Sequence, residues 1–212
     1  MPAQDRDTAG PEYTARLSTL TGKRWKRLLN VQAPYQWNHR RLLGTGRVLD
    51  VGCGIGRNLP YLPAGSLGVD HNADSVGVCR EQGHDAVTVE EFLARDPASD
   101  GGFTGLLAAH LLEHLPKGEQ VKLLRDYLSY LAPGARVVLI CPQPRGYASD
   151  ATHLVYLDLR KLRGVCEELG LDVEREMSFP LPALAGRWFS TTSGSWPPAT
   201  AARPEAPAAL RP

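Results

Sequence analysis

The chain has 212 residues, of which 42% are hydrophobic and 22% charged, a composition typical of one globular domain with a hydrophobic core. The formal net charge of +1 provides no basic field of the kind that makes nucleic acid a partner. No apolar run approaches the roughly 18 residues that span a bilayer, and residues 1–10 are too polar for a secretory signal, so we expect a cytoplasmic protein with no membrane partner.

The N-terminal part of the chain, residues 1–45, is predicted to contain one or two amphipathic helices. Basic residues and aromatic residues are mixed through positions 22–41. Such a mixture can bind phosphates and stack on bases. Because the total charge is close to zero, we interpret it instead as a solvated helix face anchored by aromatic side chains.

From residue 46 to residue 190, strand-like and helix-like segments alternate with short turns. The expected strands cover 47–51, 66–69, 85–89, 103–109, 136–141 and 171–177, and the expected helices cover 57–62, 74–82, 117–131 and 158–169. A Pro133-Gly134 turn is expected to end the third helix before the fifth strand begins. This alternation predicts an α/β fold, a mostly parallel sheet with helices on both faces.

The first expected strand ends in a turn with glycines at alternate positions, Gly52, Gly54 and Gly56. Glycines allow backbone amides to approach a ligand closely, and Asp50 is expected to face the crevice at the carboxyl edge of the sheet. The G-x-G-x-G spacing differs from the G-x-G-x-x-G spacing of dinucleotide sites and disfavours NAD. Twenty residues after Asp50, Asp70 ends the next strand, where a carboxylate can accept hydrogen bonds from both ribose hydroxyls.

With these motifs the chain resembles the class I S-adenosylmethionine-dependent methyltransferases, in particular the small "type 11" group that includes quinone-biosynthesis enzymes. The resemblance covers residues 47–179 and implies a Rossmann-like fold, S-adenosylmethionine as cofactor, and methyl transfer to an O, N or C atom of a small-molecule metabolite. It also implies that residues 1–45 form entrance or lid helices over the substrate. The cofactor-binding residues that it implies are Asp50, Gly52, Cys53, Gly54, Gly56, Asp70, His71, Glu91, Phe92 and His110.

The segment after the fourth strand is rich in histidine and resembles the family segment at the methyl-transfer site. We expect His110, His114 and the distant His153 to act in catalysis or substrate orientation, although methyl transfer can proceed by alignment and desolvation without a strong base. These histidines and Glu113 could also bind a divalent metal, because their spacing is similar to the E-x-x-E-H of small-RNA 2′-O-methyltransferases, with a histidine in place of the first Glu. Since Glu-His is common at this place in the type 11 group without metal, we predict no metal.

Two alternatives to a small-molecule methyltransferase therefore stay open. One is a metal-assisted O-methyltransferase acting on RNA or on a catechol-type hydroxyl. The other is a non-catalytic methyltransferase-like domain that binds a partner. The sequence identifies neither the methyl acceptor nor the oligomeric state.

The C-terminal region departs from the family pattern. A final antiparallel strand requires an apolar run, but the chain has Ser190-Thr191-Thr192-Ser193-Gly194-Ser195. This puts the final strand in doubt, through either an incomplete sheet or an altered reading frame. Residues 191–212 are rich in Pro and Ala and are predicted to be a disordered tail. The four widely spaced cysteines are expected to be reduced and mostly buried.

Overall fold

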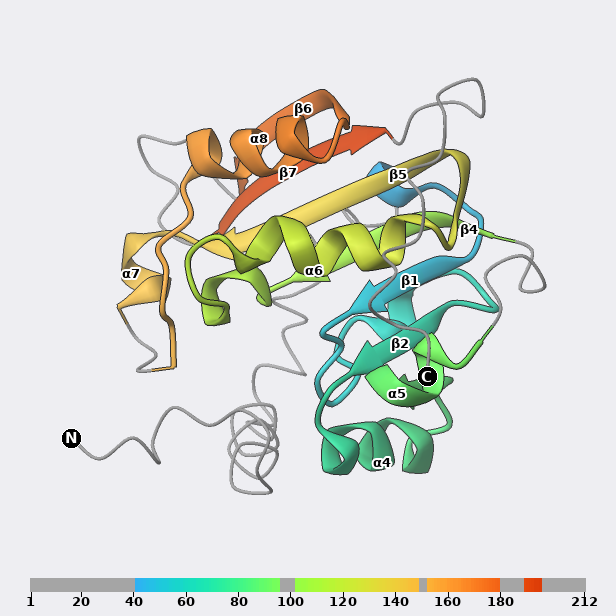
Figure 1. Cartoon of the computed structure of the whole chain (residues 1–212). Coiled ribbons are helices and arrows are strands. Elements are labelled where there is room, and N and C mark those ends of the chain that lie inside the picture. The colour runs from blue at the N-terminus through green and yellow to red at the C-terminus, as the bar shows by residue number, and fades with distance from the viewer. Residues whose placement is uncertain (1–40, 96–101, 149–151, 180–188, 196–212) are drawn as a thin grey trace.

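The computed structural model describes residues 41–95, 102–148, 152–179 and 189–195. In these residues the chain forms a seven-stranded sheet with the order β3-β2-β1-β4-β5-β7-β6 (Figure 1). The first five strands are parallel, and β7 is antiparallel to both of its neighbours. The strands are β1 Val48–Val51, β2 Leu67–Asp70, β3 Ala86–Thr88, β4 Phe103–Ala109, β5 Leu131–Pro142, β6 Asp172–Phe179 and β7 Phe189–Ser195.

Helices connect the strands, and the described chain begins with the helical residues 41–43. The α-helices are α4 Ala73–Glu81, α5 Val89–Leu93, α6 Glu119–Leu128, α7 Pro144–Tyr147 and α8 Leu159–Glu168, and the 3₁₀ turns are η2 Leu59–Tyr61 and η3 Leu112–His114. The mostly parallel, Rossmann-like α/β fold predicted from the sequence is thus confirmed. The predicted N-terminal helices lie outside the described residues, apart from the helical end at 41–43.

Strand periodicity explains the two helical layers. In β4, Leu106 and Ala108 pack into the core on one face, whereas Leu107 and Ala109 pack into the core on the other. Side chains of α5, α6 and α8 cover the first face, and side chains of α4 and the helical end at Leu43 cover the second. A parallel sheet buried on both faces requires such continuous apolar strands.

Local sequence signals begin the helices. Asn72 caps α4 by accepting a hydrogen bond from Ser75 N at 3.1 Å. Asp158 caps α8 by accepting from Lys161 N at 2.9 Å. These side chains satisfy amide groups that the first turn of a helix leaves without intrahelical partners.

Two expected boundaries in the middle of the chain are wrong. The helix expected over 57–62 is a single 3₁₀ turn, η2. Strand β5 begins at Leu131, so Pro133-Gly134 lies within the span of the strand instead of before it. The pairing of β5 with β4 shifts between Phe103 and Gly105, and this irregularity accommodates the proline in a strand next to the sheet centre.

The doubt about the final antiparallel strand is also corrected. Residues 189–195 form β7, which pairs with β5 along its whole length, from Arg136 opposite Ser195 to Pro142 opposite Phe189. Residues 191–195 therefore belong to the sheet and not to the predicted tail, whose remaining residues lie outside the described ranges. Backbone pairing with strands on both sides forms a strand here without an apolar run.

Two further properties bear on the predictions. Cys53, Cys79, Cys141 and Cys166 are all free thiols and all buried, as expected. Among the described residues, no helix combines the length and the apolar character needed to cross a membrane.

Candidate functional site

The candidate site lies where the strand order reverses. From β1 the sheet continues to β2 on one side and to β4 on the other, and ligands of open α/β sheets bind outside the carboxyl ends of the strands at such a point. The glycine turn follows β1 at this edge. Gly52, Gly54 and Gly56 all have positive φ, of 72°, 53° and 77°. The turn thus needs a backbone conformation that residues with a side chain rarely adopt.

The turn is held against β2 by backbone hydrogen bonds. Gly52 N and Cys53 N both donate to Val69 O, at 2.8 and 3.1 Å. A Cβ at Gly52 would lie 2.8 Å from a side-chain carbon of Leu111, which follows β4. The glycine therefore lets the segment after β4 pack directly on the turn.

Asp50 is the buried acid of the site. It is 1% exposed, and neither carboxylate oxygen has a hydrogen-bond partner among the described residues. Burial raises the pKa of Asp50 to about 7, the charge of nearby Asp70 adds to this effect, and the proximity of Asn58 opposes it. A buried carboxylate without a partner is costly, which points to a role that requires the acid.

Asp70 is held in place by backbone amides. Gly54 N donates to its Oδ2 at 2.7 Å, and Asn72 N donates to its Oδ1 at 2.9 Å. His71, the next residue, is exposed, and its Nδ1 lies 3.4 Å from Asp70 Oδ1. Each carboxylate oxygen has two lone pairs, so Asp70 keeps acceptor capacity while it fixes the glycine turn to the end of β2.

The side chain of Cys53 points away from this edge. A Cβ at Gly68 in β2 would lie 2.8 Å from Cys53 Sγ, and Cys53 belongs to the core between the sheet and α4. Only the backbone of Cys53 is thus placed in the turn where it could contact a ligand.

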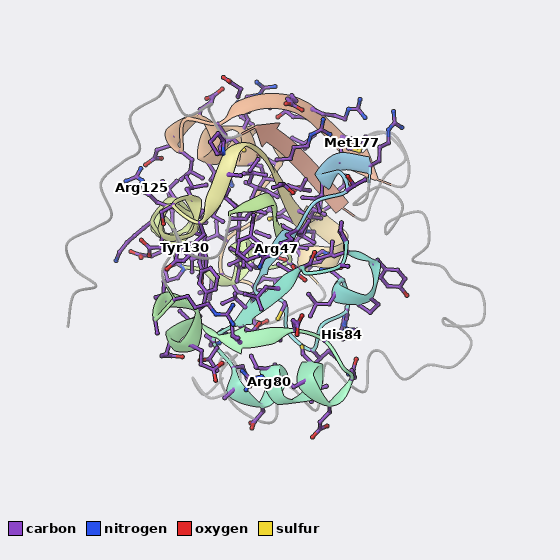
Figure 2. The ribbon with its side chains drawn as sticks, turned by 90° about the vertical axis from the view of Figure 1, so that its right-hand side faces the viewer. Arg47, Arg80, His84, Arg125, Tyr130 and Met177 are labelled. Atoms are coloured by element: carbon purple, nitrogen blue, oxygen red, sulfur yellow. The ribbon has the colours of Figure 1, made fainter. Side chains whose placement is uncertain are left out.

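Glu91 and Phe92 have contacts that the sequence prediction did not include. Glu91 completes a capping box with Thr88 at the start of α5 and pairs with Arg80 of α4. Arg80 is labelled in Figure 2. Phe92 is fully buried, and its ring lies 4.4 Å from the ring of Tyr130. The Phe92 side chain is therefore part of the core, and the cofactor-binding role expected for Phe92 stays a prediction.

Thr88 was not among the predicted site residues, and its side chain caps α5 by accepting a hydrogen bond from Glu91 N at 3.2 Å. It ends β3 opposite Asp70 in the sheet register, so it lies next to the Asp70 edge. Its polar side chain at the carboxyl end of a parallel strand was the available signal. The strand was expected to end at residue 89, one residue later than it does.

The histidine segment places strain at the same edge. His110 follows β4 with φ of 60°, the only positive φ of a non-glycine residue in the described ranges. Its amide donates to Ile140 O at 2.9 Å, and its Nδ1 donates to Glu113 Oε1 at 3.3 Å. Its side chain is 37% exposed, so the imidazole is held by a buried carboxylate while it is accessible from the edge. Strained residues of this kind cluster at functional sites.

The other two histidines gather around Glu113. The ring centroids of His114 and His153 are 4.8 Å apart, and His153 Nε2 lies 4.0 Å from Glu113 Oε1. Glu113 itself is fully buried. Burial, the largest influence, would raise the pKa of Glu113, but the hydrogen bond and charge of His110 hold that pKa below its ordinary value. The structure thus brings together the three histidines that the sequence singled out.

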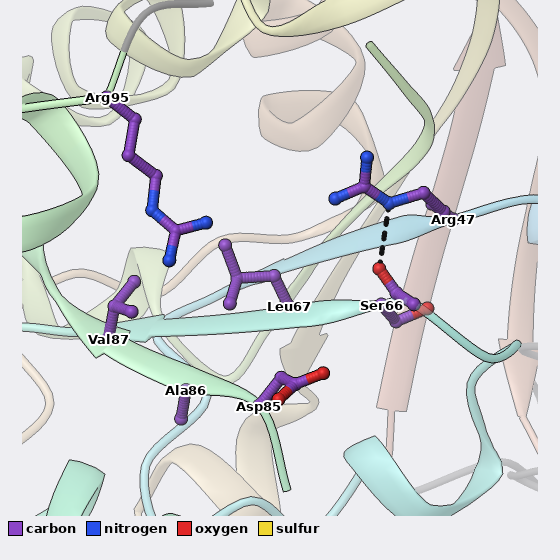
Figure 3. Close-up of a pocket in the computed structure, with 8 residues that line it drawn as sticks. Arg47, Ser66, Leu67, Asp85, Ala86, Val87 and Arg95 are labelled. Atoms are coloured by element: carbon purple, nitrogen blue, oxygen red, sulfur yellow. Dashed lines mark hydrogen bonds between the residues drawn. The ribbon is translucent and has the colours of Figure 1, made fainter. Parts of the chain in front are cut away.

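A separate pocket of about 300 Å³ lies at the opposite edge of the sheet (Figure 3). It is lined by residues that precede β1, β2 and β3, among them Arg47, Ser66 and Asp85, and by Arg95. The Arg47 side chain is engaged there, because its Nε donates to Gly65 O at 2.9 Å. This pocket contains none of the predicted site residues.

Known proteins share this architecture. A family described as "Methyltransferase domain" matches residues 20–176. The norajmaline N-methyltransferase of Rauvolfia serpentina is 26% identical over 139 residues, which cover 58% of this chain and 45% of that protein. The chain thus spans less than half the length of this curated relative.

Solved structures show the same fold. The TehB-like S-adenosylmethionine-dependent methyltransferase of Corynebacterium glutamicum superposes with a TM-score of 0.64 at 18% identity, over 87% of this chain and 98% of its own. The magnesium protoporphyrin IX methyltransferase of Synechocystis, solved with bound S-adenosylhomocysteine, gives a TM-score of 0.61 at 16% identity, over 90% and 96% of the two chains. With the matched family and this fold, the chain belongs to the methyltransferase domain family, the class I methyltransferases whose cofactor is S-adenosylmethionine.

Proposed function

We propose that this protein transfers the methyl group of S-adenosylmethionine to an O, N or C atom of a small-molecule metabolite in the cytoplasm. The observation that carries the proposal is the pair of acids at the glycine turn. Asp50 is buried without a hydrogen-bond partner among the described residues, and Asp70 is fixed beside it at the strand ends. Such a pair suits binding of this cofactor, because its methionine part carries an ammonium group and its middle part carries the ribose hydroxyls.

The residues present fit the cofactor on their own chemistry. The amino group of its methionine part would supply the positive charge that the buried Asp50 carboxylate lacks. Gly52, Gly54 and Gly56 leave the backbone open to close approach. Asp70 would accept hydrogen bonds from the ribose hydroxyls, and Thr88 and His71 flank that position.

The chemistry needs alignment more than acid–base strength. When bound, S-adenosylmethionine supplies an electrophilic methyl carbon: the acceptor atom bonds to this carbon and loses a proton, and the carbon–sulfur bond breaks to leave a neutral thioether. His110 is suited to accept that proton at Nε2, because its Nδ1 is held by Glu113 at 3.3 Å. Leu111 and the buried strand ends would keep water from the turn.

Calorimetric titration with S-adenosylmethionine and S-adenosylhomocysteine tests the cofactor site. Asp70→Asn should weaken binding about 10- to 100-fold, because hydrogen bonds to a charged acceptor contribute about 1.5–3 kcal/mol. The matched control is Asp85→Asn, the same change in an exposed residue at the opposite edge of the sheet, which should bind like the unaltered protein.

Formation of S-adenosylhomocysteine with a panel of phenols, amines and carbon acids then tests the small-molecule acceptor. Absence of binding by a folded protein, or equal binding by both variants, would contradict the proposed site. Tight cofactor binding without turnover on any acceptor class would favour the non-catalytic domain.

A further inference from the structure

We propose that Glu113, His114 and His153 form a binding site for a divalent first-row transition-metal ion, with open coordination positions for an oxygen of the methyl acceptor. The metal site stands on its own geometry, and its use on an acceptor rests on the proposed function. The three side chains come from η3 and from the loop before α8.

The donor atoms converge. One ligand atom from each of the three side chains lies within 4.8 Å of the others. A single ion bonded at about 2.1 Å holds its donors roughly 3.4 Å apart in a tetrahedral arrangement, so each donor needs to move by less than about 1 Å. Two imidazoles and one carboxylate are the donors that zinc, cobalt, iron and manganese accept together.

The carboxylate is the strongest sign of a ligand. Glu113 is fully buried, and its Oε2 has no hydrogen-bond partner among the described residues. A buried carboxylate oxygen left in this way costs free energy unless a positive group reaches it. A metal ion between Glu113 and the two imidazoles provides that positive charge.

The outer contacts match those of metal-binding histidines. His153 Nδ1 lies 2.8 Å from Tyr147 O, so this nitrogen donates to a backbone carbonyl and directs Nε2 toward Glu113. His114 Nδ1 lies 3.3 Å from Thr152 O and 3.1 Å from Thr152 Oγ1, so Nε2 would be the ligand atom of His114. A metal-bound histidine almost always donates its other ring N–H to a carbonyl or carboxylate, which fixes its tautomer and orientation.

The backbone also fixes the loop over the carboxylate. Leu154 N and Val155 N both donate to Glu113 O, at 2.7 and 3.1 Å. These bonds hold His153 next to η3 although 39 positions separate His153 from His114 in the sequence. Three protein ligands leave further positions of the ion open, as in catalytic metal sites, and His110 lies beside them at the carboxyl edge of β4.

Titration of the purified full-length protein with Co²⁺ and Zn²⁺ tests the site. We expect one ion per chain, with a visible Co²⁺ spectrum typical of nitrogen and oxygen ligands. Glu113→Gln and His153→Gln should each weaken binding more than about 100-fold, since even a lost outer contact costs 10- to 100-fold. His84→Gln removes a histidine outside the cluster and should leave the affinity unchanged.

Circular dichroism and the affinity for S-adenosylhomocysteine show whether each variant is folded, and they separate this proposal from the cofactor site. Absence of metal binding by the unaltered folded protein would overturn the proposal, as would equal metal binding by a folded His153→Gln variant. Nitrocatechol then probes the open positions. A change in its absorption that requires both Co²⁺ and His153 is expected, and absence of a change would show a closed structural site and overturn the role in acceptor binding.

Discussion

The burial of Asp50 predicts how the free energy of unfolding changes with pH. Its pKa rises from an ordinary value of 3.8 to about 7 in the folded protein, chiefly because of burial. Below pH 3.8 the carboxyl is protonated in both the folded and the unfolded chain and does not affect stability. As the pH rises toward 7, the carboxyl ionises in the unfolded chain but stays protonated in the fold. The free energy of unfolding therefore falls progressively below its value at low pH.

The difference between these two pKa values corresponds to a loss of about 4 kcal/mol in the free energy of unfolding above pH 7. About half of this loss arises between pH 5.5 and pH 8. Asp50→Asn removes the titrating group and keeps its size. The free energy of unfolding of the variant, relative to the unaltered protein, should therefore increase by about 2 kcal/mol from pH 5.5 to pH 8. Any constant cost of burying the amide cancels in this difference.

Urea denaturation followed by circular dichroism at the two pH values measures the effect. Asp74→Asn, the same change in an exposed residue of α4, should show no comparable difference. A difference between Asp50→Asn and the unaltered protein that stays constant with pH would refute the reasoning, because Asp50 would then titrate alike in both states. Asp50→Asn should also bind S-adenosylmethionine more weakly. Asp50 would then lower the stability of the ligand-free fold while it strengthens cofactor binding.

Further predictions concern the turn and α5. Gly52→Ala should cost about 1–2 kcal/mol in urea denaturation because of its φ of 72°, whereas Gly77→Ala in α4, where a Cβ meets nothing within 4 Å, should stabilise the fold by about 0.5–1 kcal/mol. Phe92→Ala should cost about 3–5 kcal/mol, since the fully buried ring packs on two tyrosines. Glu91→Ala should weaken the start of α5 but leave the calorimetric affinity for S-adenosylmethionine within twofold, and a larger loss would support the predicted role of Glu91 at the adenine instead.

Much of this architecture follows from local signals in the chain. The runs 106–109 and 137–141 are apolar without interruption, as strands buried on both faces require. The alternate glycines and the acid at the end of β2 define the cofactor edge by the same reasoning, because parallel strands end at one edge. The wide spacing of the four cysteines suits no disulfide framework, so the sequence also predicts that they are reduced and mostly buried.

The failures arise where tertiary context decides. Strand β7 consists of residues with low apolar content, and it forms because β5 and β6 present backbone partners on both sides. No periodicity within residues 189–195 contains that information. Likewise, the sequence names His153 beside Glu113 and His114, but how closely His153 approaches them depends on hydrogen bonds from Leu154 and Val155 to the Glu113 carbonyl.

The place of β7 in the sheet imposes an order on assembly during synthesis. Among the described residues β7 is the last strand in the sequence, but it lies between β5 and β6, and β6 pairs with no other strand there. A nascent chain that has emerged only to residue 188 can form the parallel part of the sheet that carries the cofactor site, strands β1 to β5. Strand β6 has no strand of the described sheet to pair with until β7 has emerged. The far side of the sheet can therefore close only after residues 189–195 have been synthesised, and shortening the chain before Phe189 would leave the edges of β5 and β6 open to pairing between molecules.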